Sequence, residues 1–318
     1  MIEFNERDDE QVDSSFVERD EINLISKVNK DLREAGKTLS DTEARYLVAA
    51  YYLAQENRIR AKAQVRESSK AGEPNDVVTW SYDSFSTIEN GIKSTLKQYV
   101  ESHTVGRWLI SIHGIGPVLS AGFMAHFSVN PWKCSNVDAR QKKNKPGCKP
   151  TEPCPDSTCG KVELPTAGHF WRFAGLDPTA VWAKKTKRPW NADLKVLCWK
   201  AGQSFMKLRS NDKDIYGAVY AERKAYEVAR NELGGNADTA ARQLKEKNYK
   251  KGSVTRNALE SGVLSDGQID ARARRYAVKL FVSHLHHVMY EHEFKKAPPK
   301  PYIIEHGGHS HFIAPPNW

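Results

Sequence analysis

Apolar residues recur at helical spacing through most of the chain after residue 39. The run Ser40–Glu43 has the spacing of a capping box, with a hydroxyl first and a carboxylate three residues later, and Leu47, Tyr51 and Leu53 follow at helical intervals. A second run carries a stripe from Ile88 to Tyr99, and Ser86–Glu89 repeats the cap signature within it. These patterns predict two helices, broken by Gly72 and Pro74.

Further helical runs follow, and no segment alternates between apolar and polar residues as an amphipathic strand does. Residues 235–266 are polar and predict a loop or a small insertion, whereas residues 128–168 are rich in Lys, Pro and Cys and have no apolar period. We therefore predict a mainly α fold, a helical bundle. The further helical runs are 104–127, interrupted by glycines, 169–175, the stretch from Ala192, 214–232, and Asp270–Phe294.

Four regions follow from these patterns. Residues 1–38 form an acidic arm with a first helix, and residues 39–103 are a helical N-terminal region. Residues 104–296 form the main domain, with the Cys-rich insertion 128–168, and residues 297–318 are a Pro- and His-rich tail. The tail is expected to dock on the body or on another subunit, which leaves a homo-oligomer open.

Composition narrows the class of protein. Of the 318 residues 39% are hydrophobic and 27% charged, so the chain can bury a core. The net charge of +9 favours a polyanionic partner, most often nucleic acid, although solubility alone can account for such a charge. Residues 1–24 carry a net −7 and residues 131–200 a net +8. No apolar run is long enough for a membrane span, and neither a signal peptide nor a disulfide framework is evident, which indicates a cytoplasmic chain with no membrane partner.

Residues 112–117 hold a tight turn between two helical stretches. Gly114 and Gly116 permit a sharp turn and close approach of a phosphate, and Pro117 suits the first turn of the next helix. The backbone amides at that helix start form an anion site. The pattern matches a helix-hairpin-helix motif that grips a nucleic-acid backbone through His113, Gly114, Ile115 and Gly116, and the alternative is an interhelical turn with no ligand.

Three later segments join this turn in a recognisable order: residues 173–178 (FAGLDP), residues 190–195 (WNADLK), and residues 271–280 (ARARRYAVKL). Together they resemble the C-terminal domain of insertion-sequence transposases of the RNA-guided DEDD recombinase class. The resemblance covers roughly residues 104–210 and 268–294 and implies a nucleic-acid grip. That family also uses an acidic metal site and a serine nucleophile. Residues 1–100 lack an apolar strand ending in Asp, and only Thr179 and Thr186 offer hydroxyls between Pro178 and Asn191, so strand cutting stays open.

Four cysteines, Cys134, Cys148, Cys154 and Cys159, lie within twenty-six residues of a Pro-rich loop that has few apolar residues. Four thiolates around a structural Zn²⁺ would supply the folding energy that such a loop lacks. The spacing is not the usual pair of CxxC knuckles, so unpaired or redox-active thiols and disulfides stay as alternatives. Cys198 sits in an apolar helix and is expected to be a buried small hydrophobe.

Basic residues accompany aromatics in and after this loop. Trp182 and Trp190 flank the basic residues at 184–188. Cations can bind phosphates and aromatic rings can stack on unpaired bases, so this mixture suits a nucleic-acid surface. The alternative is that the two tryptophans turn inward. His284, His287 and Glu291 share a helix face, where hydrogen-bonded histidines are favoured over a second metal site. The basic candidates for nucleic-acid binding are Lys142, Lys143, Lys145, Lys184, Lys185, Lys187 and Arg188.

The leading hypothesis is a DNA- or RNA-binding protein related to transposases, with DNA the expected partner. One alternative is an active transposase or recombinase that cuts DNA with metal ions. Another is a mobile-element or phage factor that acts through protein–protein contacts.

Overall fold

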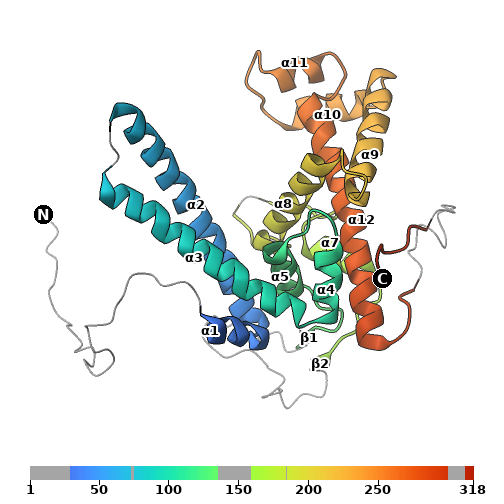
Figure 1. Ribbon diagram of the computed structural model, residues 1–318. Coiled ribbons are helices and arrows are strands. Elements are labelled where there is room, and N and C mark those ends of the chain that lie inside the picture. Colours follow the sequence, from blue (N-terminus) through green and yellow to red (C-terminus); the bar gives the residue numbers. More distant parts are fainter. Residues whose placement is uncertain (1–28, 73–74, 135–158, 184, 300–311) are drawn as a thin grey trace, which may run out of the picture.

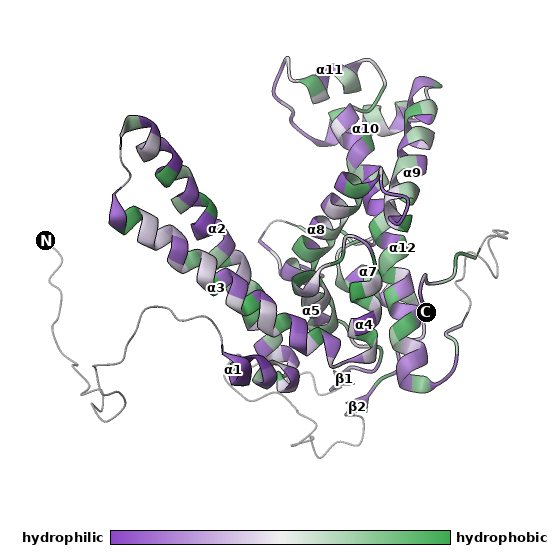
Figure 2. Cartoon of the chain, in the orientation of Figure 1, coloured by the Kyte–Doolittle hydropathy of each residue, from purple (hydrophilic) through white to green (hydrophobic). Residues whose placement is uncertain are grey.

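The computed structural model describes residues 29–72, 75–134, 159–183, 185–299 and 312–318, and within them the chain is a bundle of α-helices (Figure 1). The prediction of a mainly α fold is confirmed. Hydrophilic and hydrophobic residues alternate along α9 (Ile215–Glu232) and α12 (Asp266–Phe294) (Figure 2), as expected for helices with one buried side. No helix of the described chain has a stretch long and apolar enough to cross a membrane.

The N-terminal helices form an arm that projects from the body (Figure 1). Short α1 (Lys30–Ala35) precedes α2 (Asp41–Ala71) and α3 (Asp76–Glu101), which pack against each other. Ser40 closes the predicted capping box, because its amide donates to Glu43 Oε2 at 2.8 Å and its hydroxyl accepts from the Glu43 amide at 3.3 Å. The same spacing at Ser86–Glu89 lies inside α3, as the sequence placed it, and makes no cap: the Ser86 hydroxyl donates to the Tyr82 carbonyl at 2.8 Å.

The body is organised around the last long helix, α12, which contacts α4, α7, α8 and α9. Phe281 of α12 is fully buried, and its ring lies 5.2–6.3 Å from the rings of Trp108, Phe123, Phe205 and Tyr216. Five helices, from three widely separated parts of the sequence, therefore meet at one aromatic centre. The helices are α4 (Thr104–Ser111), α5 (Pro117–His126), α7 (Ala167–Phe173), α8 (Ala192–Leu208), α9 (Ile215–Glu232) and α12 (Asp266–Phe294).

A small lobe replaces the predicted loop within residues 235–266. It contains α10 (Ala237–Glu246) and α11 (Val254–Glu260), so of the two predicted alternatives the small insertion is confirmed and the loop is not. The lobe has its own small apolar cluster of Ala240, Leu259, Leu264 and Ile269. These two short helices have few apolar residues, so the segment is polar on average although α10 has an apolar face.

Two short segments complete the body. Strands β1 (Trp132–Lys133) and β2 (Gly160–Lys161) pair antiparallel and bring together the two ends of the Cys-rich insertion. Residues 312–318 lie on the body, where the Trp108 indole donates to the Pro316 carbonyl at 2.7 Å and the Asn317 amide donates to the Ser111 carbonyl at 3.2 Å. For this part of the tail, the prediction that it docks on the body is confirmed.

Candidate nucleic-acid interface

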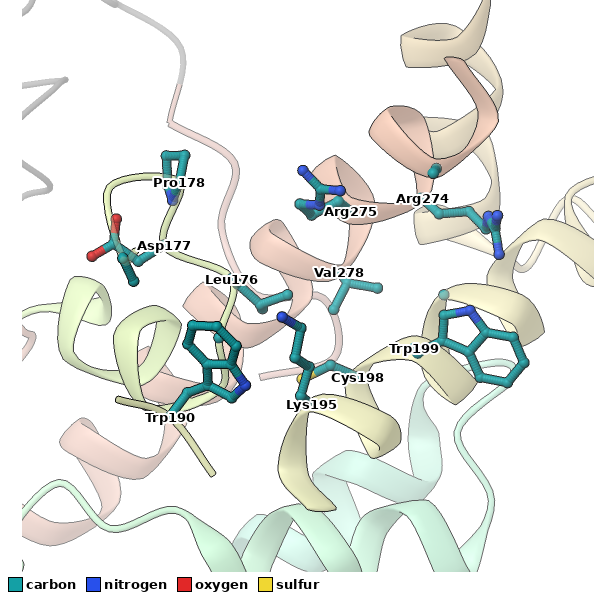
Figure 3. Close-up of a pocket in the computed structure, with 14 residues that line it drawn as sticks. Leu176, Asp177, Pro178, Trp190, Lys195, Cys198, Trp199, Arg274, Arg275 and Val278 are labelled. Atoms are coloured by element: carbon teal, nitrogen blue, oxygen red, sulfur yellow. The ribbon is translucent and has the colours of Figure 1, made fainter. Parts of the chain in front are cut away.

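A cavity of about 380 Å³ lies between the turn after α7, helix α8 and helix α12 (Figure 3). Its walls include both charged and aromatic side chains, and three of the four segments that carry the transposase resemblance meet there. These segments contribute Gly175–Pro178, Trp190 with Lys195, and Arg274 with Arg275.

Two glycines allow the walls to come together. Gly175 has φ +67, and a Cβ there would lie 2.8 Å from Trp190 Cγ and 3.0 Å from Lys195 Cδ. Gly202 lets α12 approach α8, since a Cβ there would lie 3.0 Å from Val278 Cγ2. Side chains at either position would push a wall of the cavity outward.

Cations gather around the cavity. The Lys195 ammonium lies 4.1 Å from the centroid of the Trp190 ring, and the Arg188 guanidinium carbon lies 5.3 Å from that of Trp182. Burial lowers the pKa of Lys195, and repulsion from Arg275 and Arg188 lowers it further. Lys195 therefore lies close enough to Arg275 and to Arg188 to be repelled by both.

A fourth cation, Lys279, stands over the Trp171 ring at 3.9 Å. Burial lowers its pKa, the Asp177 carboxylate opposes this, and Arg275 adds to it. Arg274 differs from these four cations, because its guanidinium makes a salt bridge to the Asp270 carboxylate at 2.7 Å. Among the described residues, no salt bridge neutralises Arg188, Lys195, Arg275 or Lys279.

The carboxylate at the cavity, Asp177, is held in a local turn. It accepts hydrogen bonds from the Thr179 hydroxyl at 2.7 Å and the Thr179 amide at 2.8 Å. These bonds lower the pKa of Asp177, which makes its carboxylate a weak base. The second hydroxyl of the loop, Thr186, donates to the Ala183 carbonyl at 2.7 Å.

The predicted hairpin is a tight turn between α4 and α5. The Ile115 amide donates to the Ile112 carbonyl at 3.0 Å, and Gly114 takes φ +89, as the third residue of a type II turn does. Gly116 is exposed and precedes Pro117, the first residue of α5. Within the described chain, no protein acceptor meets the amides of Gly116, Val118 or Leu119.

His113 faces the interior instead of the anion position. Its Nε2 atom is buried, and the ring interacts with the carboxyl of Asp214, a residue that is 1% exposed. Burial raises the pKa of Asp214. The turn and the cavity lie on different sides of α8. Gly114 packs on Ser204 and Leu208, whereas Lys195 and Trp199 line the cavity from another side of the helix.

The strand pair brings two of the four predicted zinc ligands together. The Sγ atoms of Cys134 and Cys159 lie 3.2 Å apart at the end of β1 and β2. A disulfide would hold them at about 2.05 Å, and two thiolates sharing a tetrahedral zinc would stand roughly 3.8 Å apart for Zn–S bonds near 2.3 Å. The distance of 3.2 Å matches neither bonded arrangement and is that of a thiol–thiol hydrogen bond. Cys148, Cys154, Lys142, Lys143, Lys145 and Lys184 lie outside the described residues, and Lys185, Lys187 and Arg188 are exposed.

The helix histidines bind protein groups. His284 Nδ1 lies 2.7 Å from the Tyr216 hydroxyl, and His284 Nε2 lies 2.9 Å from the Ile313 carbonyl. Burial lowers the pKa of His284 to about 4. His287 Nε2 lies 3.1 Å from Glu291. The interpretation as hydrogen-bonded histidines is confirmed, and His284 also attaches the tail. In the described part of the chain, no three His, Cys, Asp or Glu residues are grouped closely enough to hold a metal ion.

Sequence reasoning did not select Lys195, Trp199, Arg275 or Lys279 as site residues. A signal was present, because Lys195 and Trp199 are four residues apart on one helix, as are Arg275 and Lys279 on another. Cys198, by contrast, is 1% exposed, and burial raises the pKa of its thiol to about 12, which confirms it as a buried small hydrophobe.

Comparisons of the chain with protein-family models, with curated proteins and with solved structures found no match.

Proposed function

We propose that the protein binds nucleic acid, with DNA the expected partner, by placing backbone phosphates against the cavity between α8 and α12. The observation that carries the proposal is that Lys195 and Arg275 line one tryptophan-lined cavity. Arg188 lies close enough to Lys195 to repel it, and Lys279 is repelled in the same way by Arg275. Cations that hold phosphates supply most of the affinity for a nucleic-acid backbone.

The electrostatics of this surface favour an anionic ligand. Burial is the main cause of the lowered pKa values of Lys195 and Lys279, and repulsion from Arg275 lowers both further. A phosphate bound among them would replace mutual repulsion with attraction. Its binding would therefore raise both pKa values towards or above their ordinary range.

The position of the cavity also supports a relation to transposases, which we include in the proposal. The segments 173–178, 190–195 and 271–280 carry the resemblance, and all three contribute residues to this cavity. Strand cutting is a separate hypothesis. Asp177 is a weak base for the Thr179 hydroxyl, so the geometry supports binding better than a hydroxyl nucleophile.

Two further contacts belong to the proposal. The open amides at the start of α5 would hold one more phosphate. Zinc bound by Cys134, Cys148, Cys154 and Cys159 would fix the basic loop 135–158 at the end of β1 and β2, because Cys134 and Cys159 already meet there.

Charge reversal tests the proposal. We expect Arg275→Glu to weaken binding to labelled duplex DNA, single-stranded DNA or structured RNA by at least about tenfold in fluorescence anisotropy, because a phosphate contact becomes a repulsion. Arg60→Glu is the matched control, since Arg60 lies on the projecting arm with its side chain 72% exposed. It should change affinity less than about twofold.

The alternatives predict other results. Equal effects of Arg275→Glu and Arg60→Glu would contradict the cavity as the binding site. No salt-sensitive binding to any probe would contradict nucleic-acid binding and favour a protein-interaction factor. Metal-dependent cleavage of the labelled duplex would show in addition that the protein cuts DNA, as an active recombinase or nuclease does.

A further inference from the structure

We infer that the cavity accepts one unpaired nucleotide, with its base stacked on Trp199 and its phosphate against Lys195 and Arg275. The inference rests on the proposed function and adds that single-stranded nucleic acid makes a contact that a duplex cannot make. It begins with the exposed indole on the cavity wall, to the right of Lys195 in Figure 3.

Trp199 differs from the other tryptophans of the body. Its side chain is 59% exposed although it lines a cavity, and in the described chain its ring contacts no other ring or cation and its N–H meets no acceptor. Trp108 and Trp171, by contrast, donate to the carbonyls of Pro316 and Lys279. A large aromatic side chain left exposed beside a cavity is typical of a binding surface.

The cations are placed to hold a phosphate beside that ring. Lys195 lies one helical turn before Trp199 on α8, and its ammonium points into the cavity between Trp190 and Trp199 (Figure 3). Arg275 comes from α12 on the opposite wall and lies close enough to repel Lys195. A base on the indole would therefore place its own phosphate within reach of two cations from two helices.

The size of the cavity selects the form of the ligand. At about 380 Å³ it lies at the lower end of small-ligand pockets, which suits a single nucleotide unit and excludes a stacked base pair. In a duplex both faces of each base are covered by neighbours, so only an unpaired or unstacked base can present a face to Trp199. A duplex would then engage the same cations through phosphates alone.

The variant Trp199→Ala separates these contacts. We expect it to weaken binding of a single-stranded oligonucleotide by roughly fivefold to 150-fold, the range for loss of one stacking side chain, and to leave duplex affinity within about twofold. Trp199→Phe should keep part of the affinity because a smaller ring remains. Trp80→Ala is the matched control, since Trp80 is 55% exposed on the projecting helix α3 and lies outside the cavity.

A probe that lacks bases tests the same contact without changing the protein. Wild-type protein should bind an abasic single strand more weakly than the matched strand with bases, by a factor similar to that of Trp199→Ala. The variant should bind both strands equally. This comparison stays valid if Trp199→Ala fails to fold, because the wild-type ratio then carries the test.

The results separate this inference from the proposed function. If Arg275→Glu weakens binding but Trp199→Ala and the abasic probe have no effect on single strands, the stacking inference is wrong and phosphate binding stands. Equal losses for single strands and duplex in a folded Trp199→Ala would also overturn it. If the wild-type protein binds no probe, the proposed function itself fails.

Discussion

Gly116→Asp tests the start of α5 by giving the helix a carboxylate of its own. Gly116 is the N-cap residue, with φ −86 and ψ 174, a conformation that Asp adopts readily. A Cβ added there meets nothing within 4 Å. The Asp carboxylate can therefore accept from the open amides of Val118 or Leu119 without moving the backbone.

The expected effects on stability and on binding have opposite signs. Replacing Gly by Asp at an N-cap contributes a few tenths of a kcal/mol, and the helix dipole adds about 0.3–1 kcal/mol. We expect the free energy of unfolding to rise by about 0.5–1 kcal/mol. If α5 holds a phosphate, losing that charge-assisted hydrogen bond, at about 1.5–3 kcal/mol, weakens binding by roughly tenfold to 150-fold.

Urea denaturation and fluorescence anisotropy with labelled duplex measure the two effects on one sample. Gly116→Asn is the neutral control, because its side-chain carbonyl can accept from the same amides but adds no charge to repel a phosphate. A variant that is more stable and binds as tightly as the wild type would refute the phosphate grip at α5. A less stable variant would show that the amides already have partners.

Three other predictions concern the fold and the metal. Gly114→Ala should lower the free energy of unfolding by about 1–2 kcal/mol in urea denaturation, because φ is +89 and the new Cβ would lie 3.1 Å from Ser204 Oγ. Gly116→Ala should lower it by less than about 1 kcal/mol, because its φ of −86 suits Ala and only the N-cap preference for Gly over Ala is lost; equal effects would contradict the turn geometry. The folded-state pKa of His284 is about 4, below its ordinary value of 6.5. The contribution of neutral His284 to the free energy of unfolding is therefore fully present above pH 6.5 and is lost as pH falls towards 4. Urea denaturation at pH 7.5 and pH 5 should show this loss of stability in the wild type and a smaller loss in His284→Gln. An equal loss in both proteins would contradict the role of His284. Metal analysis should find about one Zn²⁺ per chain and less in Cys134→Ser, whereas a zinc-free wild type with all four thiols open to alkylation would exclude the site.

The helices were predictable where one face is strongly apolar, as in Asp270–Phe294, which lies within α12. Capping signals were less reliable. The same hydroxyl-to-carboxylate spacing occurs at Ser40, where the chain enters a helix, and at Ser86, where the hydroxyl bonds back to Tyr82 inside one. Spacing alone does not tell these apart, because the choice depends on whether the preceding turn is already helical.

The cavity was beyond prediction because it is made by packing. Periodicity places Lys195 and Trp199 on one face of α8, but it does not say that Gly175 and Gly202 let the 175–178 turn and α12 close around them. The hairpin shows the converse. Its turn and the proline at the start of α5 follow from the sequence, whereas the inward direction of His113 towards Asp214 depends on a residue one hundred positions away.

The central claim is that cations around one cavity hold backbone phosphates. Its most direct test is the salt dependence of duplex affinity in wild type and Arg275→Glu, measured by anisotropy from 50 to 200 mM salt. If all four cations contact phosphates, log K against log salt should have a slope of about −3.6 in the wild type and about −2.7 in the variant. A slope near zero, or the same slope in both proteins, would contradict the claim.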